Sequence, residues 1–496
     1  MRRLKNVLGL LGTIIKWFGV LYIIPLLFAL FYGAGATAFI VPMFICLALG
    51  WALEKVFPGS DLEVADGFLL VILTWFGVSW LGALPYIIHG VGNLSEPINA
   101  FFESASGFTC TGSTIMDEIS VEKYSHAIMI WRQMTQWIGG MGILVLAVAV
   151  LPRLSVGGVQ FLDNEVPGPK MDRLTPHMAE TARRLWVLYI GLSVVLFLIL
   201  LVIGLAGLDP VMTPYQAFAH ALTTIPSGGF SPLGRSAEAL APIVQWILVP
   251  FMLIAAVNFT LLWFALFKGP RVFWRDTEFK VFMAISMGAG TLLGALLLGA
   301  DQYPTAEENF RHGFFQMATF ISTTGFASTD FAEWKGDSHA ILLLLMPIAG
   351  CVGSTSGGPK VLRWIIAFKV IVRELVQQIH PSAVRPLRVG ERVLHEDVVK
   401  GAMIFLVTYL ILFVVSVGVL AVDLRIAGID LPIEDIASAV TATLGNIGPG
   451  YGAVGPMAGF GFFPVFSKIW MCVLMIAGRL EVMTLLVLLS PWYWRD

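Results

Sequence analysis

Ser322-Thr-Thr-Gly-Phe-Ala-Ser-Thr329 is one of four similar stretches around which the chain is organised. The other three are Phe108-Thr-Cys-Thr-Gly-Ser-Thr114, Ile225-Pro-Ser-Gly-Gly-Phe-Ser231 and Leu444-Gly-Asn-Ile-Gly-Pro-Gly450. Each follows a short, moderately apolar segment, and a long apolar segment lies on either side of this pair. A unit of roughly a hundred residues that recurs along a chain indicates a repeat architecture.

The composition indicates a membrane protein with many spans. Hydrophobic residues make up 57% of the 496 residues and charged residues 13%, and the mean hydropathy is +0.82. Runs of about eighteen residues or more with almost no charge, each enough for one span, recur from end to end. The first run, from Leu8 to Phe31, is too long for the apolar core of a signal peptide, so we expect a retained helix. The net charge of -2 indicates no particular partner.

The order of apolar segments predicts an N-terminal helix pair followed by four repeats. The helix pair occupies residues 1–56, with apolar segments at 11–32 and 37–53. The repeats are predicted at residues 60–152, 183–268, 277–378 and 400–492, with cytoplasmic links at 153–182 and 379–399. The long helices within the repeats are predicted at 67–88, 127–151, 185–205, 242–267, 278–298, 338 onward, 400–422 and 464–489.

The short segment in each repeat is the most informative part. These segments cover residues 97–108, 214–224, 309–322 and 432–443. At about 1.5 Å per residue they cannot cross a hydrocarbon layer of about 30 Å, so we predict half-helices that enter and turn back. Irregular backbone at membrane depth is tolerated only where protein buries it or water lines it. The expected fold is therefore an all-α polytopic membrane protein with two N-terminal transmembrane helices and four pseudo-symmetric helix–pore loop–helix repeats around one pore.

Lys and Arg set the expected orientation. The links at 153–184, 268–280 and 363–400 are rich in basic residues, which places them in the cytoplasm. The loop-bearing links are then external and mostly acidic, which would concentrate cations at the mouth. Their acidic residues are Asp117, Glu118, Glu307, Glu308, Asp330, Glu333, Glu434 and Asp435.

The glycine-centred loops predict a carbonyl-lined filter. Glycine permits backbone conformations that turn successive carbonyl groups in one direction. Four such strands around an axis would replace the water around a bare monovalent cation. A divalent cation would lack the carboxylates it prefers, because none of the loops carries an acidic residue. Any one loop alone would be read as an ordinary turn; four loops behind half-length helices favour the filter.

The pattern resembles the Trk/Ktr/HKT superfamily of potassium transporters, and most closely the bacterial TrkH-type membrane subunit, over essentially the whole chain. The resemblance implies one filter glycine per repeat, with Gly229 preferred over Gly228 because Phe230 then matches Phe326. In related plant transporters, Ser at the first glycine accompanies sodium preference, so four glycines imply potassium. The predicted filter residues are Cys110, Thr111, Gly112, Gly228, Gly229, Thr324, Gly325, Ile447 and Gly448. Sodium uptake or weak selectivity is the alternative.

The third repeat contains a predicted gate. The run from residue 338 to 378 is too long for one span, and Gly350-Cys-Val-Gly-Ser-Thr-Ser-Gly-Gly-Pro-Lys360 interrupts it with helix breakers. The resemblance implies an intramembrane gating loop at 350–359 and a cavity arginine at Arg479. Alternatives are an Arg479–Glu481 pair, snorkelling of Arg479 to the cytoplasmic edge, and an interfacial anchor at Lys360. The predicted gating residues are Gly350, Gly353, Ser354, Thr355, Ser356, Gly357, Gly358, Lys360 and Arg479.

The remaining features point away from enzymatic chemistry. The segments 353–360 and 450–455 mimic nucleotide-binding motifs but lack the residues and the surrounding strands that such motifs need. No catalytic constellation is visible, and we expect no cofactor other than the transported potassium ion. The isolated His220 and His312 are expected to be packing residues, and the four scattered cysteines to be small buried residues. A coupled transporter would use broken helices in inverted pairs, whereas these repeats share one orientation.

The resemblance also implies the protein's surroundings. It implies a multi-pass protein of the bacterial cytoplasmic (inner) membrane, in contact with lipid, and a homodimer in which each protomer has its own pore. It further implies that a cytosolic nucleotide-binding regulatory ring of the TrkA type docks on the cytoplasmic face, with no nucleic acid involved. Whether flux is passive or coupled to protons or sodium, as in a symporter, stays open.

Overall fold

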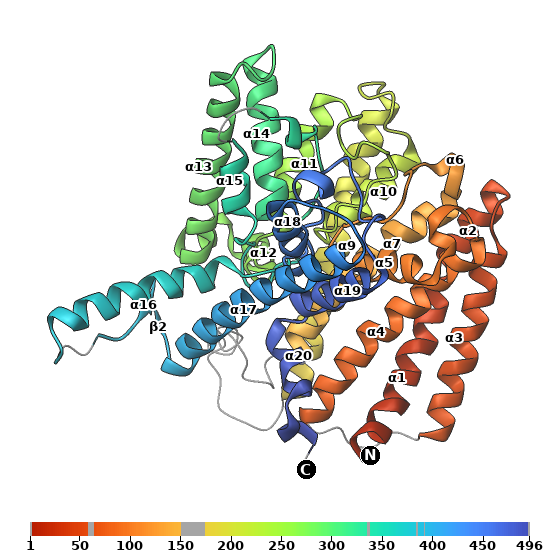
Figure 1. Ribbon diagram of the computed structural model, residues 1–496, viewed down its shortest axis with the longest axis horizontal. Helices are drawn as coiled ribbons and strands as arrows, with labels where there is room; N and C mark the ends of the chain where they lie inside the picture. The colour runs from red at the N-terminus through yellow and green to blue at the C-terminus, as the bar shows by residue number, and fades with distance from the viewer. Residues whose placement is uncertain are drawn as a thin grey trace.

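The computed structural model describes residues 2–57, 64–149, 174–334, 338–382, 385–390 and 392–494. It is almost entirely helical, as predicted (Figure 1). Most of the predicted link 153–182 lies outside the described residues. Within the described part, six helices are long and apolar enough to cross a membrane, or up to eight if each of two bent pairs counts as one span.

The N-terminal pair packs closely through small residues. It consists of α1 (Arg2–Leu21), α2 (Ile23–Tyr32) and α3 (Thr37–Val56). Gly12 and Gly50 face each other, and a Cβ on either would lie within 2.8 Å of the other's carbonyl oxygen. Small residues let two membrane helices approach in this way. Lys16 and Glu54 add an ion pair of 2.5 Å between the two helices.

Each repeat contains two long helical stretches and a short helix between them. Repeat 1 comprises α4 (Val64–His89), η1 (Gly92–Ser95), α5 (Pro97–Phe108), α6 (Val121–Tyr124) and α7 (His126–Ala149). Repeat 2 comprises α9 (Leu174–Leu205), α10 (Pro214–Thr224), α11 (Pro242–Ala255) and α12 (Phe259–Lys268), and η3 (Pro270–Arg275) follows it. Helix α9 begins inside the range that we predicted as a link.

The second half repeats this plan with additions. Repeat 3 comprises α13 (Thr277–Gly299), α14 (Ala306–Ile321), η4 (Phe331–Glu333), α15 (Ser338–Leu345) and α16 (Val361–Ile379). Strands β1 (Arg388–Val389) and β2 (Arg392–Val393) form an antiparallel hairpin. Repeat 4 comprises α17 (Glu396–Ile426), α18 (Ile433–Leu444), η5 (Gly452–Val454), α19 (Val465–Arg479), α20 (Val482–Leu489) and η6 (Pro491–Trp494).

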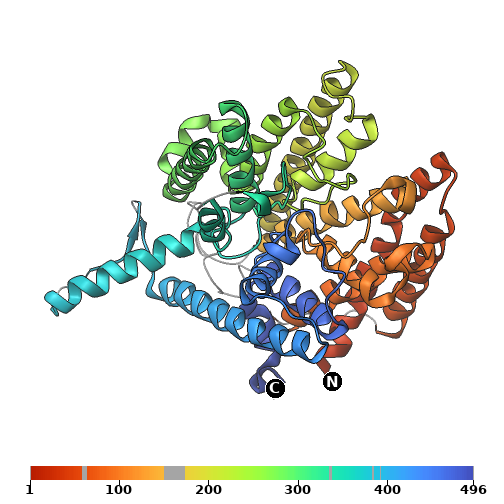
Figure 2. The same cartoon turned by 45° about the horizontal axis from the view of Figure 1, so that its top comes forward.

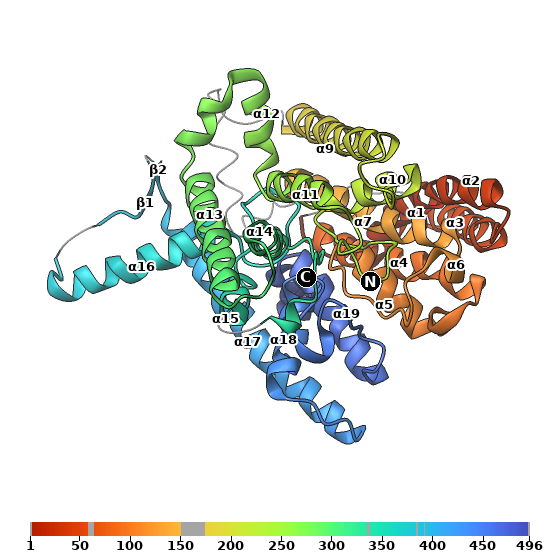
Figure 3. The same ribbon diagram turned by 90° about the horizontal axis from the view of Figure 1, so that it is seen from above.

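The short helices begin with strong local signals. Proline occupies the first turn of α5 and α10, where its missing N–H costs nothing. Thr305 and Glu308 form a capping box at the start of α14. Seen from above, α5, α10, α14 and α18 lie around a common centre (Figure 3). Their C-terminal ends lead into the glycine loops, so the negative ends of the four helix dipoles lie near that centre.

Two long helices that we predicted as continuous are bent. The predicted helix 242–267 divides into α11 and α12, which meet at 101°. The predicted helix 464–489 divides into α19 and α20, which meet at 113°. Asn258 caps α12 through its side-chain oxygen, and Glu481 begins α20 with a φ of 59°. A polar residue therefore stands at each bend: Asn258 lies next to Gly353, and Glu481 pairs with Arg363.

Helix α16 projects away from the body (Figure 2). The link after it, predicted at 379–399, contains the β1–β2 hairpin. Its hairpin region carries Leu387 and Val389, which pack with Leu362 and Ile366 in a small buried cluster. Gly390 at the hairpin turn lies next to Thr277, since a Cβ there would be 2.7 Å from the threonine hydroxyl oxygen. The link thus contacts the beginnings of α13 and α16.

Candidate functional site

The four glycine loops share one backbone conformation. Each loop has two residues with positive φ, separated by a single residue. The first of each pair is a non-glycine residue with φ between 52° and 58°, and the second is a glycine with φ between 75° and 103°. The pairs are Cys110/Gly112, Ser227/Gly229, Thr323/Gly325 and Asn446/Gly448. This conformation makes Gly229, not Gly228, the equivalent of the other three glycines.

The loops meet in a closed ring. At each glycine, a Cβ would collide with the carbonyl oxygen of the residue before the glycine in the next loop. The distances from the added Cβ to that oxygen are 2.4 Å for Gly112 and Gly228, 1.9 Å for Gly229 and Thr324, 2.3 Å for Gly325 and Ile447, and 2.8 Å for Gly448 and Thr111. The sequence-predicted residues of all four repeats are therefore brought together, and only glycine fits both the space and the positive φ.

Hydrogen bonds fix the ring from outside. The Gln136 amide on α7 donates to the Gly228 carbonyl at 2.6 Å, and its oxygen accepts from Phe230 N–H at 3.0 Å. The Ser113 hydroxyl donates to the Gly448 carbonyl at 2.8 Å, which ties the first loop to the fourth. A carbonyl oxygen has two lone pairs, so both of these carbonyls retain one for another partner. Such bracing holds the oxygens at fixed separations.

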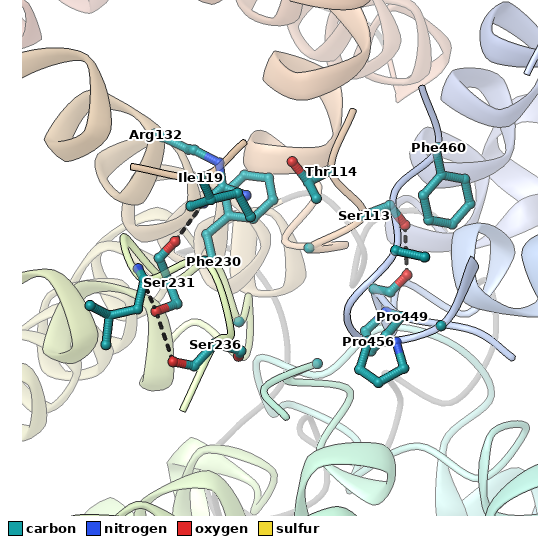
Figure 4. A pocket seen from close by; sticks show the side chains of 18 residues that line it. Ser113, Thr114, Ile119, Arg132, Phe230, Ser231, Ser236, Pro449, Pro456 and Phe460 are labelled. Carbon is teal, nitrogen blue, oxygen red and sulfur yellow. Dashed lines mark hydrogen bonds between the residues drawn. The ribbon is translucent and has the colours of Figure 1, made fainter. Parts of the chain in front are cut away.

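A cavity of about 50 Å³ opens directly beside the ring. Gly112, Gly229, Gly325 and Gly448 all line it, so it touches every repeat. Figure 4 shows the side chains that surround it. One water-sized probe needs only about 10–15 Å³, so the cavity can hold a few groups the size of a water molecule. Arg132 is also part of its wall.

The acidic residues expected around the mouth are partly neutralised. Asp117 pairs with Lys123 at 2.8 Å, and Glu307 pairs with Arg311 at 2.9 Å. The hydrogen bond to Asp117 raises the pKa of Lys123, so this lysine stays charged. Asp435 instead accepts a hydrogen bond from Ala453 N–H at 2.9 Å. The rim is thus less negative than a count of its acids predicts.

The predicted gating loop lies against the other side of the ring. In three of the four glycine loops, it contacts the non-glycine residue that has a positive φ. The Thr355 hydroxyl lies 2.9 Å from the Ser227 hydroxyl, and Gly357 N–H donates to the Thr323 hydroxyl at 2.8 Å. A Cβ at Gly357 would be 2.5 Å from the Asn446 Cβ. The loop therefore covers the base of the ring.

Arg479 completes this cover at the remaining loop, the first. Its guanidinium donates to the Thr355 carbonyl at 2.6 Å and to Cys110 Sγ at 3.3 Å. The side chain is only 3% exposed. Glu481, the alternative partner, pairs instead with Arg363 at 2.7 Å. Arg479 thus joins the gating loop to the first glycine loop, and its charge lies beneath the ring.

Hydrogen bonds hold the gating loop together at its ends and within it. Ala349 and Lys360 form a bridge, with Ala349 N–H donating to the Pro359 carbonyl at 3.0 Å. Lys360 is buried, and its ammonium donates to the carbonyls of Ser356 and Gly357 within the loop. The Glu278 carboxylate accepts from Val352 N–H at 2.9 Å and Leu362 N–H at 3.1 Å.

The break between α11 and α12 receives the loop. Cys351 N–H donates to the Ala256 carbonyl at 2.8 Å, and Phe259 N–H donates to the Gly353 carbonyl at 3.0 Å. A Cβ at Gly350 would lie 2.5 Å from the same Ala256 oxygen. The bend thus supplies backbone groups that the irregular loop needs as partners.

Sequence reasoning missed several residues of this assembly. Ser227, Thr323 and Asn446 could have been found, because each stands two positions before its glycine, as Cys110 does. Gln136 and Glu278 carry no local signal, since their partners lie in other segments. His220 and His312 are buried and hydrogen-bond to Ser231 and Ser328, as expected of packing residues. Among the described residues, no group of three or more His, Cys, Asp or Glu could hold a metal ion. All four cysteines are buried and free.

Comparisons with known proteins match nearly the whole chain. The family model TrkH, described as a cation transport protein, matches residues 36–494. The chain is 37% identical to the Trk system potassium uptake protein TrkH of Vibrio parahaemolyticus, over 99% of both chains. It is also 37% identical, over 99% of both chains, to the protein of the same name from Escherichia coli K12. The crystal structure of the potassium transporter TrkH from Vibrio parahaemolyticus matches with a TM-score of 0.87 and 34% identity, covering 99% of this chain and 100% of that one.

Proposed function

The chain belongs to the TrkH family of cation transport proteins, and from this premise we propose that it takes up potassium across the bacterial cytoplasmic membrane through the ring of four glycine loops. The single observation that carries the proposal is the closed ring, in which each glycine abuts a carbonyl oxygen of the next loop. Carbonyl oxygens at fixed positions can replace the hydration shell of a monovalent cation. The names of the relatives, all potassium uptake proteins, support the choice of ion.

In this proposal the ion enters from the cavity side and leaves past the gating loop. The dipoles of the four short helices favour a cation at their C-terminal ends. The loop at 350–359 closes the path, and Arg479 adds a positive charge that repels a cation leaving the ring. Opening then requires the loop and Arg479 to separate from the bases of the glycine loops.

The alternative is uptake of sodium or of monovalent cations with weak selectivity, or symport with protons or sodium. Purified protein in liposomes, given K⁺, Rb⁺ or Na⁺ with and without a proton gradient, tests these possibilities. We expect K⁺ and Rb⁺ flux to exceed Na⁺ flux. Equal rates for the three ions would favour weak selectivity. Flux that stops when the proton or sodium gradient is removed would assign coupling.

We also propose that the protein is a dimer that uses α16. Along this projecting helix Phe368, Ile371, Leu375 and Ile379 are between 55% and 73% exposed, and their spacing places them on one face. A second copy would cover a face that the described part of this chain leaves open. Changing Phe368 and Leu375 to Lys should turn dimers into monomers in lipid nanodiscs. Dimers that persist in this variant would place the interface elsewhere.

The regulatory ring is proposed on the side of the molecule that carries the termini. In the predicted basic link 268–280, Arg271 and Arg275 lie in η3 and Lys280 lies in the first turn of α13. A negatively charged or polar surface of a nucleotide-binding partner would suit them. Co-purification of the tagged chain with such a partner from the source cells, and its loss at high salt, would support this interface.

A further inference from the structure

A fully buried ion pair lies beside the ring, on the cavity side. Arg132 of α7 and Glu103 of α5 are 2.6 Å apart, and their side chains are 2% and 0% exposed. Neither residue belongs to a glycine loop. Burying two charges costs solvation free energy, so a buried ion pair is costly to keep unless it serves a purpose. Removing one partner leaves an uncompensated charge in a low-dielectric site.

Each member of the pair holds a different loop. The Glu103 carboxylate accepts from the Thr114 hydroxyl at 2.9 Å and from Ile115 N–H at 2.8 Å. These residues follow Gly112 in the first loop. The Arg132 guanidinium donates to the Ser231 carbonyl at 2.9 Å and lies 3.6 Å from the centre of the Phe230 ring. These residues follow Gly229 in the second loop, so one ion pair fixes the outer halves of two neighbouring loops.

The other two loops are held at the same place without an ion pair. In the third loop the Ser328 hydroxyl lies 2.8 Å from His312 Nδ1 and accepts from the Gln316 amide at 3.4 Å. In the fourth loop Tyr451 N–H donates to the Ser438 hydroxyl. The charged brace therefore belongs to the first and second loops alone among the described residues, and it breaks the fourfold pseudo-symmetry of the ring.

Arg132 also lines the cavity, next to the path of the ion (Figure 4). A free guanidinium there would repel an approaching cation, whereas the adjacent Glu103 carboxylate cancels its charge. The pair thus combines a positive donor group, suited to holding carbonyls, with electrical neutrality at the mouth. A lysine could not reproduce this, because it lacks the planar fork that spans two acceptors.

We propose that Glu103 and Arg132 are positioning residues that set the separation of the first two loops and thereby the preference for potassium over sodium. This inference rests on the proposed uptake of a monovalent cation. Selectivity by a carbonyl ring depends on the distance between its oxygens, so a brace that fixes two loops acts on selectivity without touching the ion.

The test uses the full-length protein in liposomes and compares K⁺ and Na⁺ flux per folded protein. Arg132→Lys keeps the charge and loses the bond to Ser231 and the aromatic contact. We expect the K⁺/Na⁺ flux ratio to fall by about tenfold, the factor that one charge-assisted hydrogen bond can supply. Glu103→Gln should in addition raise the KM for K⁺, because it leaves the arginine charge uncompensated beside the entry path.

Two further variants keep the test decisive. Phe230→Leu removes only the aromatic contact of Arg132, so it should lower the ratio less than Arg132→Lys and serves if the latter does not fold. Glu54→Gln breaks the distant Lys16–Glu54 pair and should leave the ratio unchanged. Unchanged ratios in folded Arg132→Lys and Phe230→Leu would overturn the proposal and leave a purely structural pair. Absence of K⁺ flux in the unaltered protein would instead overturn the proposed function.

Discussion

At the scale of single residues, the site depends on positions where the backbone excludes every side chain. The four ring glycines could be recognised in the sequence because a positive φ next to another loop's carbonyl demands glycine. The side chains that brace them could not be recognised. Gln136 and Gly228 are 92 positions apart, and Ser113 and Gly448 are 335 apart, so nothing local relates donor to acceptor.

Gly112→Ser should weaken the preference for potassium over sodium. The serine Cβ would lie 2.4 Å from the Gly228 carbonyl oxygen and would adopt a φ of 86°. Because such a contact is far below van der Waals distance, the Gly228 carbonyl must shift and the spacing of the ring changes. Flux of Rb⁺ and Na⁺ into proteoliposomes measures the effect, and we expect the Rb⁺/Na⁺ ratio to fall by about tenfold or more.

Gly207→Ser is the matched control for this substitution. Gly207 also has a positive φ, 71°, but a Cβ added there would have no other group within 4 Å. It therefore imposes similar backbone strain, about 1 kcal/mol, away from the ring. Equal ratios for Gly112→Ser and Gly207→Ser would argue against a filter at Gly112.

Arg479→Ala should raise the resting flux of potassium. The substitution removes the bonds from the guanidinium to the Thr355 carbonyl and Cys110 Sγ, together with a positive charge beneath the ring. Uptake of Rb⁺ by liposomes in the absence of any partner protein is the measurement. Arg479→Lys keeps the charge without the planar fork, so its resting flux should lie between those of the unaltered protein and Arg479→Ala. A lower flux in folded Arg479→Ala would count against a gate at this position.

At the scale of elements, short helices could be predicted better than long ones. Helices α5 and α10 begin and end at the predicted residues, because a proline starts each and an irregular loop ends each. The bends after Ala255 and Arg479 were missed. Each bend has a polar residue, Asn258 or Glu481, within a long apolar stretch, and a single polar residue does not predict a break. The partners that stabilise the bends, the gating loop for one and Arg363 for the other, come from repeat 3.

Glu278→Gln should loosen the gating loop and raise flux. One carboxylate oxygen of Glu278 accepts N–H bonds from Val352 and Leu362, which stand at the two ends of the loop. The neutral amide is a weaker acceptor, and one of its two terminal atoms accepts nothing, so we expect about 1–2 kcal/mol less restraint on the loop. Rb⁺ uptake measures the flux, and limited proteolysis near residue 352 measures exposure of the loop.

Asp423→Asn provides the comparison for Glu278→Gln. Asp423 likewise accepts two hydrogen bonds through one oxygen, from Ser467 N–H at 3.0 Å and from the Ser467 hydroxyl at 2.6 Å. Asp423 lies away from the gate. It should destabilise the protein by a similar amount and leave resting flux unchanged. If both variants change flux equally, the effect is general loosening rather than release of the loop.

At the scale of the whole molecule, the ring is where all four repeats meet. The first and fourth repeats are joined there by the Ser113–Gly448 bond and by the bond from the Asn446 amide to the Thr111 hydroxyl. Four carbonyl groups whose dipoles converge repel one another unless a cation lies between them. The bound ion should therefore hold together segments that are more than 300 residues apart in the chain.

Potassium should accordingly stabilise the folded protein as a whole. A ligand that binds only the native state adds RT ln(1 + [L]/Kd) to the free energy of unfolding, about 2.7 kcal/mol at a hundredfold excess over Kd. The thermal unfolding midpoint in detergent should rise with the logarithm of K⁺ or Rb⁺ concentration, and much less with Na⁺ or choline at equal ionic strength. In Gly112→Ser the difference between K⁺ and Na⁺ should shrink, while Gly207→Ser should keep it. A midpoint that responds equally to all four cations would mean that the ring holds no specific ion, because only ionic strength would then be at work.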